Sequence, residues 1–559
     1  MSVNLSSALL VVKSGLMRRK PMRGAKSAKW VAGAAVIALA ATACGGGDSD
    51  GGKKNTSGQP AGYVSIDVGE PQKPLMPADT NESNGSYVIQ SLFTQLLDFD
   101  DKGEIVLTNA ESVETEDSKT WTVKLKAGWK FHNGEAVTAQ SYIDAWNWYA
   151  NVKNAQQNAF WFSDIKGYAD VHPEKGDPKS DKMSGLKAVD DTTFTIELTD
   201  KVPYFNYKLG YATFAPLPKV FYDDPKAFGQ KPIGNGPYTF EKWTHKKLIQ
   251  VKAWPEYQGP NKAANKGIQF KNYSTVEAAY QDVISGNLDM IRQVGPRDLP
   301  KYKTDLGDGA IDQPYAAIQT LVPAFYSKSF KDIDPKVLQG LSMAIDRDTI
   351  TKTVLNGTRI PATSFTPPQV KGNQTLDSDI LKYNPAKAKE LIKAGGGVPE
   401  NKFTIQYNAD GGHKEWVTAV CESIRNATGV ECTGDAKPDF PTDLEARDND
   451  EVKGFYRGGW VADYPVNVNF LKELYHSKAE SNNGRFNDKE VDALMAKGDK
   501  ADSLEESVAA YQEVEKKLVE KMPAIPLWYY AINGGHGKNV DNVKVDFHGD
   551  LELTGVTTK

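Results

Sequence analysis

The sequence predicts an α/β protein with more than one domain. Segments that alternate hydrophobic and polar residues, as half-buried strands do, lie between segments with the 3.6-residue period of helices. The chain has 559 residues, and a single hydrophobic core stops growing at about 250–300 residues, so at least two domains are expected. Hydrophobic residues make up 40% of the sequence, which suits a folded protein.

Three segments carry the strand pattern most clearly. Hydrophobic residues occupy every second position in 120–125, 194–198 and 403–407, which would place them on one face of a sheet. An acidic run from Glu445 to Glu451 is predicted to be a solvated loop.

Five helix starts are marked by a capping residue. A side-chain oxygen of Ser, Thr, Asp or Asn can accept an N–H group of the first turn that has no partner within the helix. A proline at the first helical position strengthens two of these starts, and glycine or proline marks the predicted ends. The caps are Thr138, Asp334, Asp346, Asn384 and Ser503, and the ends are Gly357, Gly395 and Pro523.

Residues 1–43 are expected to be a secretory signal peptide. Six basic residues between Arg18 and Lys29 precede 13 small or apolar residues, 31–43. A membrane-spanning helix needs about 20 apolar residues, so this run is too short to span, and the pattern is that of a cleaved signal. Met1, Met17 and Met22 are all candidate translation starts.

The six residues that end at Cys44, LAATAC, resemble a bacterial lipobox, whose cysteine is diacylated and becomes the first residue. Ala41 stands where leucine is usual. Residues 44–60 are rich in Gly, Ser and Asp, as in a flexible tether. Several acyl chains would hold the protein on the cell membrane as an extracytoplasmic lipoprotein, since one chain binds only marginally. The alternative is an ordinary signal peptide with a chance cysteine.

Several functional classes are disfavoured by the sequence. The net charge is −5, from 67 basic and 72 acidic residues, without a basic stripe for nucleic acid. Three cysteines do not make a disulfide scaffold. The sequence has no H-E-x-x-H, G-x-S-x-G or P-loop motif, so no enzyme activity, cofactor or metal is expected. Acidic residues before Gly103 faintly suggest a calcium loop, but Lys102 and Asn109 occupy ligand positions, so a hairpin turn is favoured.

Five blocks stand in order along the sequence: SLFTQLLD (91–98) followed by DKG (101–103), WTVKL (121–125) leading to GWKFHNGEAVTA (128–139), IGNGPY (233–238), LSMAIDR (341–347) and PAIPLWYY (523–530). Together they resemble the extracellular solute-binding proteins of the oligopeptide, dipeptide and nickel group (family 5), which serve ABC importers. Gly234 and Gly236 in these blocks are expected to serve backbone geometry, and His132 is expected to be a turn or core residue. Asn235 stands where the family usually has Thr.

The resemblance implies two α/β lobes of the type II periplasmic-binding-protein-like fold, with an extra inserted domain and a ligand cleft between the lobes. Ligand contacts with both lobes would favour a closed form, which permease subunits would recognise. ATP would be hydrolysed by separate ATPase subunits, and the chain is expected to be a monomer. Lobe I would hold 61–107, 212–318 and 525–559, the inserted subdomain 108–211, and lobe II 319–524.

The run RGGWVADYP, 457–465, resembles the cleft-lining run of peptide-binding members. There an aspartate pairs with the ligand's α-ammonium group, and by position this role falls to Asp463. A carboxylate suits it because a charge-assisted hydrogen bond would hold the charged end of any peptide. Main-chain groups near Gly459 and Val461 would pair with the peptide as an added strand does. The expected ligand-binding residues are Asp463, Arg457, Gly459, Trp460, Val461 and Tyr464.

The resemblance gives two of these residues further roles. Arg457 would approach a ligand carboxylate at some peptide lengths, and Trp460 would form the wall of a side-chain pocket. The alternative is an aromatic strand end with an ordinary surface aspartate at Asp463.

Other functions stay open beside the capture of short peptides. Members of the same fold bind dipeptides, nickel chelates, oligosaccharides or opines, and a peptide-signal receptor is compatible with import. Asp463 argues against a sugar, which needs no ammonium partner. A secreted enzyme or an adhesion protein is the rival from another class.

Val461 replaces the cysteine that forms a disulfide in enteric members. Cys421 lies on the inward face of a predicted helix, and Cys432 follows in a short strand. Nearby cysteines outside the membrane usually pair, so a Cys421–Cys432 bridge is expected. Two buried thiols are the alternative.

Overall fold

The computed structural model of the chain describes residues 59–100 and 102–559. The expected signal peptide, Cys44 and most of the tether lie outside these residues. Within the described part of the chain, no helix combines the length and hydrophobicity that crossing a membrane requires.

A mixed 11-stranded sheet runs through the protein, which confirms the predicted α/β class. Its strands follow the order β15-β14-β16-β12-β17-β11-β1-β10-β9-β8, with β13 beside β17. One half of the sheet comes from expected lobe I and the other from expected lobe II. The bounds are β1 (Tyr63–Asp67), β8 (Tyr238–Thr244), β9 (Leu248–Ala253), β10 (Gly267–Lys271), β11 (Met290–Ile291), β13 (Ile360–Pro361), β14 (Lys402–Asn408), β15 (Glu431–Lys437) and β16 (Phe455–Val461).

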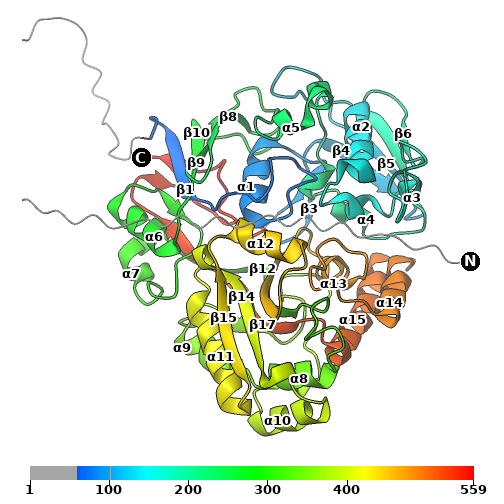
Figure 1. Cartoon of the computed structure of the whole chain (residues 1–559). Helices are drawn as coiled ribbons and strands as arrows, with labels where there is room; N and C mark the ends of the chain where they lie inside the picture. Colours follow the sequence, from blue (N-terminus) through cyan, green and yellow to red (C-terminus); the bar gives the residue numbers. More distant parts are fainter. Residues whose placement is uncertain (1–58, 101) are drawn as a thin grey trace, which may run out of the picture. The chain divides into compact units, whose positions relative to one another are not determined.

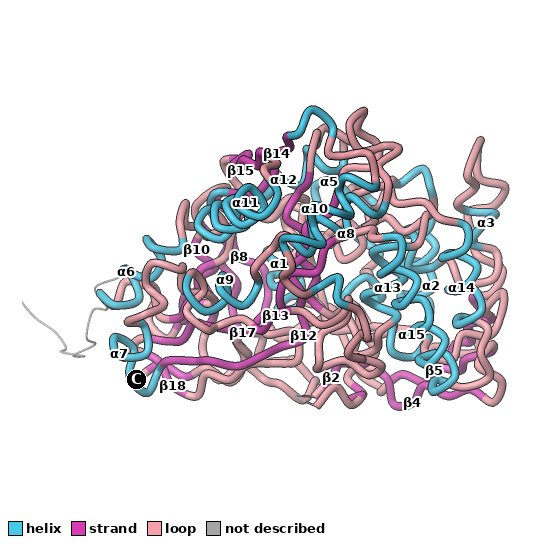
Figure 2. The backbone as a smooth tube through the Cα atoms, turned by 90° about the horizontal axis from the view of Figure 1, so that it is seen from below, coloured by secondary structure: helices cyan, strands magenta, loops and turns pink. Residues whose placement is uncertain are grey.

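Two long strands join the halves of the sheet. Strands β12 (Ala310–Pro323) and β17 (Ile525–His536) pair antiparallel (Figure 2). β12 also pairs with β16 of lobe II, and β17 with β11 of lobe I. Strand β17 therefore contacts both halves of the sheet, whereas the resemblance implies that it belongs to lobe I alone. Trp528 still belongs to the core of lobe II, because its ring meets Trp416 edge-on at 5.3 Å.

The inserted subdomain contains a four-stranded antiparallel sheet covered by helix α2 (Ala139–Ala150) (Figure 1). Its order is β4 (Ala110–Thr115), β5 (Thr120–Leu125), β7 (Thr193–Glu197) and β6 (Leu186–Ala188). The alternating residues of β5 face inward, as predicted. Phe194 of β7 packs on Tyr142 and Trp146 of α2, with ring centroids 5.7 Å and 5.6 Å apart, so the sheet and the helix share one core.

All five predicted caps stand at helix starts, and each side chain accepts an N–H bond from the first turn. Helix α9 ends at Thr353, four residues before the predicted end at Gly357. The helices are α1 (Ser83–Leu92), α3 (Tyr168–Val171), α4 (Phe205–Lys208), α5 (Pro225–Phe228), α6 (Val276–Ser285), α7 (Tyr302–Leu306), α8 (Pro335–Met343), α9 (Arg347–Thr353), α10 (Pro385–Ala394), α11 (Lys414–Thr428), α12 (Phe440–Asp448), α13 (Val468–Tyr475), α14 (Lys489–Asp499) and α15 (Leu504–Lys521).

The predicted acidic loop is wrong in its first half, because helix α12 extends through Asp448. Asp439 caps this helix by accepting the N–H of Thr442. Asp443 and Arg447 form a buried ion pair one turn apart. Helix α12 therefore has a buried face, which the acidic composition of the segment does not indicate.

The block around Gly234 packs tightly against the end of α1. A Cβ atom on Gly234 would lie 1.9 Å from the carbonyl oxygen of Leu92, and one on Gly236 2.5 Å from the Leu92 carbonyl carbon. Both glycines thus permit a close backbone approach, as expected. His132 is a half-buried turn residue that accepts the N–H of Gly234 at Nδ1 (3.1 Å), and burial lowers its pKa to about 4. The short strands β2 (Leu97–Phe99) and β3 (Ile105–Leu107) form the predicted hairpin, and β18 (Val540–Asp541) pairs with β19 (Thr557–Thr558).

Cys421 of α11 and Cys432 of β15 are joined by a disulfide in the structure. Both residues are buried, with exposed fractions of 3% and 1%. In Figure 1, α11 lies beside β14 and β15, the yellow strands. The bond thus ties this helix to the edge strand of the large sheet. The oxidation state in the cell stays a prediction.

Candidate functional site

A cavity of about 370 Å³ lies between lobe I and lobe II. Residues such as Gln90 and Arg292 line it from lobe I, and residues such as Asp410 and Tyr456 line it from lobe II. Its size is in the range of small-molecule binding sites, about 300–1,000 Å³. Its walls carry both charged and aromatic side chains, so it can hold an amphipathic ligand.

Strand β16 presents an open edge to this cavity. β12 pairs with β16 along Phe455–Val461, whereas β14, on the other side, pairs only with Phe455 and Tyr456. Within the described residues, no strand pairs with 457–461 on that second edge.

The hydrogen-bond pattern tells which main-chain groups point to the open edge. The N–H of Ala462 donates to the carbonyl of Ala316 on the β12 side (2.8 Å). Main-chain groups of an antiparallel strand alternate in direction, so those of Arg457, Gly459 and Val461 point away from β12. A ligand with an extended backbone would find these N–H and C=O groups available.

Asp463 follows the end of β16 and lines the cavity. Burial raises the pKa of its carboxyl group to about 7. A hydrogen bond from Asn469 (2.8 Å) opposes this rise, the charge of Glu473 adds to it and His548 opposes it. No Lys or Arg among the described residues forms a salt bridge with Asp463. The carboxylate is therefore suited to a cation that the ligand brings.

Arg457 lies six residues before Asp463, near the other end of the open edge, and its side chain is buried. Its Nε donates to Oδ1 of Asn408 (3.0 Å), and its guanidinium stands over the ring of Phe440, 4.8 Å from the centroid. Within the described part of the chain it has no salt-bridge partner. Burial lowers its pKa, but a guanidinium stays protonated in proteins, so it can receive a ligand carboxylate.

The three predicted residues between these two charges also line the cavity: Gly459, Trp460 and Val461. The indole N–H of Trp460 donates to Oδ1 of Asn469 (3.1 Å), which leaves the ring as a fixed wall. The structure thus brings five of the six predicted residues together along one strand and the turn that follows.

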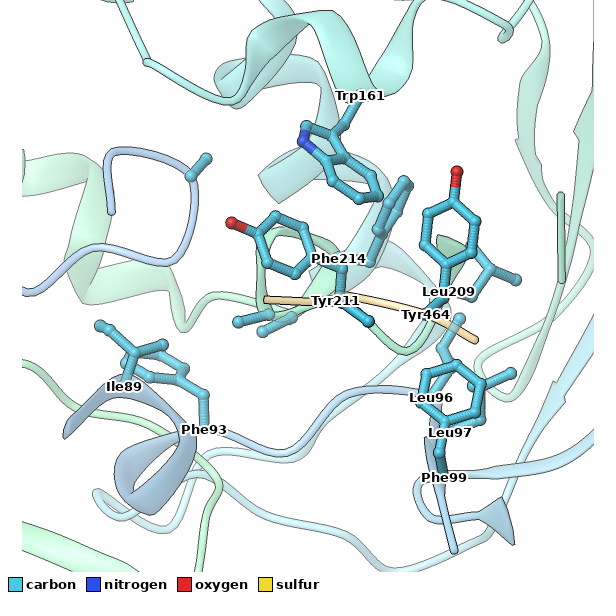
Figure 3. Close-up of a cluster of buried hydrophobic side chains, with 14 of the residues drawn as sticks. Ile89, Phe93, Leu96, Leu97, Phe99, Trp161, Leu209, Tyr211, Phe214 and Tyr464 are labelled. Atoms are coloured by element: carbon cyan, nitrogen blue, oxygen red, sulfur yellow. The ribbon is translucent and has the colours of Figure 1, made fainter. Parts of the chain in front are cut away.

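The sixth residue, Tyr464, does not line the cavity, which corrects its expected role as a ligand contact. Its side chain is fully buried among those in Figure 3. It meets Trp161 edge-on at 5.9 Å and lies parallel to Tyr204 at 6.5 Å. Asp463 and Tyr464 lie in the bend that follows β16. In this bend Asp463 lines the cavity, whereas Tyr464 packs into the core.

The opposite wall of the cavity was missed by the sequence analysis. Arg292 forms an ion pair with Asp550 (3.2 Å), and both residues line the cavity. His548 donates from Nδ1 to the carbonyl of Ala462 (2.9 Å), next to Asp463. Arg292 lies far from His548 and Asp550 in the sequence, and the three residues form no motif, so only the fold brings them together.

The charge of His548 depends on its acidic neighbours. Burial alone would lower its pKa, but the carboxyl groups of Asp546 and Asp98 raise it above the usual value. A ring whose protonated form is favoured by these carboxyl groups thus faces the loop of Asp463 from the opposite lobe. In the described residues, no group of three or more His, Cys, Asp or Glu side chains could hold a metal ion.

A family model described as bacterial extracellular solute-binding proteins, family 5, middle, matches residues 104–482. The oligopeptide-binding protein OppA of Bacillus subtilis is 26% identical over 537 residues, which covers 92% of this chain and 96% of that protein.

Solved structures with the same fold include Haemophilus influenzae OppA in complex with the peptide RPPGFSPFR. It is 24% identical, with a TM-score of 0.81 over 89% of this chain and 99% of that one. The murein tripeptide-binding protein MppA of Escherichia coli is also 24% identical, with a TM-score of 0.80 over 89% of this chain and 98% of that one. For the unliganded open form of MppA, the TM-score is 0.63 over 89% of this chain and 97% of that one.

Proposed function

The chain belongs to family 5 of the bacterial extracellular solute-binding proteins, and from this premise we propose that it captures short peptides outside the cell and delivers them to an ABC importer. One observation carries the proposal: the open edge of β16 faces a cavity and ends beside the carboxylate of Asp463, which has no salt-bridge partner among the described residues. Similar proteins carry names that state oligopeptide binding.

An extended peptide would bind along β16 as an added strand. Its main chain would pair with Gly459 and Val461, which needs no particular ligand sequence. Its ammonium group would bind Asp463 through a charge-assisted hydrogen bond, and Trp460 would contact the side chain next to it. This division lets one site accept peptides of different sequence.

Ligand length follows from the distance between the two charged residues. Asp463 is six positions after Arg457, and a strand rises about 3.3 Å per residue, so their Cα atoms lie at most about 20 Å apart. A ligand of about four to six residues would reach from the carboxylate to the guanidinium. A sugar would leave Asp463 without a cation, which is why we favour a peptide.

Transport would need partners that the chain itself does not supply. We propose that permease subunits recognise the ligand-bound form and that separate ATPase subunits hydrolyse ATP, with this chain acting as a monomer and not as an enzyme. The similar proteins are named as binding proteins, which agrees with this division of roles.

Anchoring through a lipid on Cys44 is part of the proposal. Cys44→Ser should move the protein from the membrane fraction to the medium, because the thiol that would carry the acyl chain is lost. Immunoblots of both fractions measure this, with peptide binding by the released protein as the control for folding. Full retention on the membrane would disprove the lipobox interpretation.

The peptide proposal is tested by titration calorimetry with a tetrapeptide and its N-acetylated form. Asp463→Asn should weaken binding of the free-amino peptide on the order of 100-fold, because its ammonium would be buried without a counter-charge. Binding of the acetylated peptide should change little. Asp435→Asn, on β15 and outside the cavity lining, is the control. Equal affinity of native protein and Asp463→Asn for the free peptide would remove Asp463 from the site.

A further inference from the structure

Asn469 lies directly behind the Asp463 carboxylate and is not part of the cavity lining. It stands in the first turn of α13 and is fully buried. Its Nδ2 donates to Oδ2 of Asp463 (2.8 Å), and its Oδ1 accepts the main-chain N–H of Asp463 (2.9 Å) and the indole N–H of Trp460 (3.1 Å). One amide thus contacts both the charged group and the aromatic wall beside it.

The partners of Asn469 fix the orientation of its amide. If its oxygen and nitrogen were exchanged, the NH₂ group would face two N–H donors and the oxygen would face a carboxylate. The bond to Oδ2 also leaves Oδ1 of Asp463 without a hydrogen-bond donor from the residues that the structure describes. That oxygen is the one available to a ligand.

The helix that carries Asn469 is itself held rigidly. Its neighbours Phe470 and Leu471 are fully buried, and α13 packs beside α15 (Figure 2). A side chain on such a helix has little freedom, so it can impose an orientation on a loop residue.

Building on the proposed function, we propose that Asn469 is the positioning residue of the amino-end site, which aims the carboxylate of Asp463 at the ligand's ammonium group and fixes Trp460 beside it. The ligand then does not have to order either side chain on binding, which removes an entropic cost. Selection for a free amino terminus and the shape of the adjacent pocket would depend on the same amide.

The test compares the affinities of the native protein and Asn469→Ala for a free-amino tetrapeptide and for its N-acetylated form. The ratio of the two affinities should fall on the order of 10-fold, because a hydrogen bond to a charged group is lost. Acetylated peptide, which offers no ammonium, should bind nearly as before. A second readout is the pH profile: loss of the Asn469 bond raises the pKa of Asp463, so the midpoint of the profile should move to higher pH.

Asn467→Ala is the matched control. Asn467 is equally buried and immediately precedes α13, but its Nδ2 donates to the carbonyl of Val508 (3.1 Å) and not to Asp463. It should lower the melting temperature without changing the affinity ratio or the pH midpoint. If Asn469→Ala does not fold, Asn469→Ser replaces it in the same comparison.

The outcomes separate this inference from the proposed function. A native preference for the free-amino peptide that persists unchanged in the Asn469 variant overturns the positioning role and leaves the function standing. No native preference overturns both. A parallel loss for both peptides, matched by Asn467→Ala, would reduce Asn469 to a structural residue.

Discussion

Opposing effects act on the carboxyl group of Asp463. Burial raises its pKa to about 7, with a contribution from Glu473, whereas the bond from Asn469 and the charge of His548 oppose the rise. A bound ammonium group would favour the ionised carboxylate and so lower this pKa. Peptide binding and loss of the Asp463 proton are therefore coupled.

The coupling predicts how affinity depends on pH. Below about pH 7 the free protein holds a proton on Asp463 that the ligand's ammonium must displace, so affinity should fall by up to about tenfold per unit, or ~50-fold from pH 7 to pH 5. Above about pH 8 the ligand loses its own ammonium proton, and affinity should fall again. Calorimetry from pH 5 to 9, in buffers of different ionisation enthalpy, measures the affinity and the proton release.

Other buried acids near the site also contribute to the pH dependence of affinity, so the contribution of Asp463 has to be separated from theirs. Glu82 and Asp546 also have pKa values raised to about 7, first of all by burial, so some pH dependence should persist in Asp463→Asn. The steep fall of affinity between pH 7 and pH 5 should disappear in that variant, and it should also be absent for the N-acetylated peptide. An equally steep profile for native protein and Asp463→Asn would place its origin elsewhere.

Elements were predicted well where their signal is local. A cap such as Thr138 acts on the first turn after it, and strand alternation depends on neighbouring residues. Helix α12 was missed because its inward face depends on the buried pair of Asp443 and Arg447, which composition alone does not reveal. The expected boundary before Ile525 stands at the start of β17, a strand that serves both lobes, and no sequence signal within this strand separates them.

The same distinction applies to the candidate site. Its lobe II wall was predictable because Arg457–Asp463 is one strand and its exit. The lobe I wall, with Arg292 and His548, was not, because these residues meet only through the fold. Tyr464 was assigned to the site by its place in the motif, although in the bend after β16 its ring packs against Trp161 and Tyr204 in the core. Asn469 was missed because it acts from behind the cavity.

At the scale of the whole molecule, a buried ionic network joins the inserted subdomain to lobe II. Lys472 of α13 lies 3.5 Å from Oδ1 of Asp164 and 3.0 Å from Oδ2 of Asp499, and it donates to the hydroxyl of Tyr204 (3.2 Å). Lys208 also binds Asp164 (2.6 Å). Although burial opposes it, the two lysines lower the pKa of Asp164 to about 2, so the network is charged.

Exposed ion pairs between the same parts surround this network. Lys500 lies 3.0 Å from Asp200, and Lys201 lies 2.6 Å from Asp502. Each exposed pair contributes about 0–1 kcal/mol, whereas leaving a buried charge without its partner costs about 3–5 kcal/mol. Lys472 therefore dominates the electrostatic contacts between the inserted subdomain and lobe II.

The last prediction concerns the opening of the lobes. If ligand entry requires lobe II to separate from the inserted subdomain, water would solvate Asp164 and Asp499 in the open form. Lys472→Met would then penalise only the closed form. We expect peptide affinity to fall on the order of 100-fold, and the radius of gyration of the ligand-free protein, measured by small-angle scattering, to increase.

Lys500→Met is the control, because it removes an exposed pair at the same interface and should change affinity by less than about fivefold. Saturating peptide should bring Lys472→Met back to the native radius, since binding shifts the population toward the closed form. A lower melting temperature with unchanged affinity and radius would mean that the network stabilises the fold and takes no part in closure. If melting temperature, affinity and radius are all unchanged, Lys472 contributes neither to the stability of the fold nor to closure.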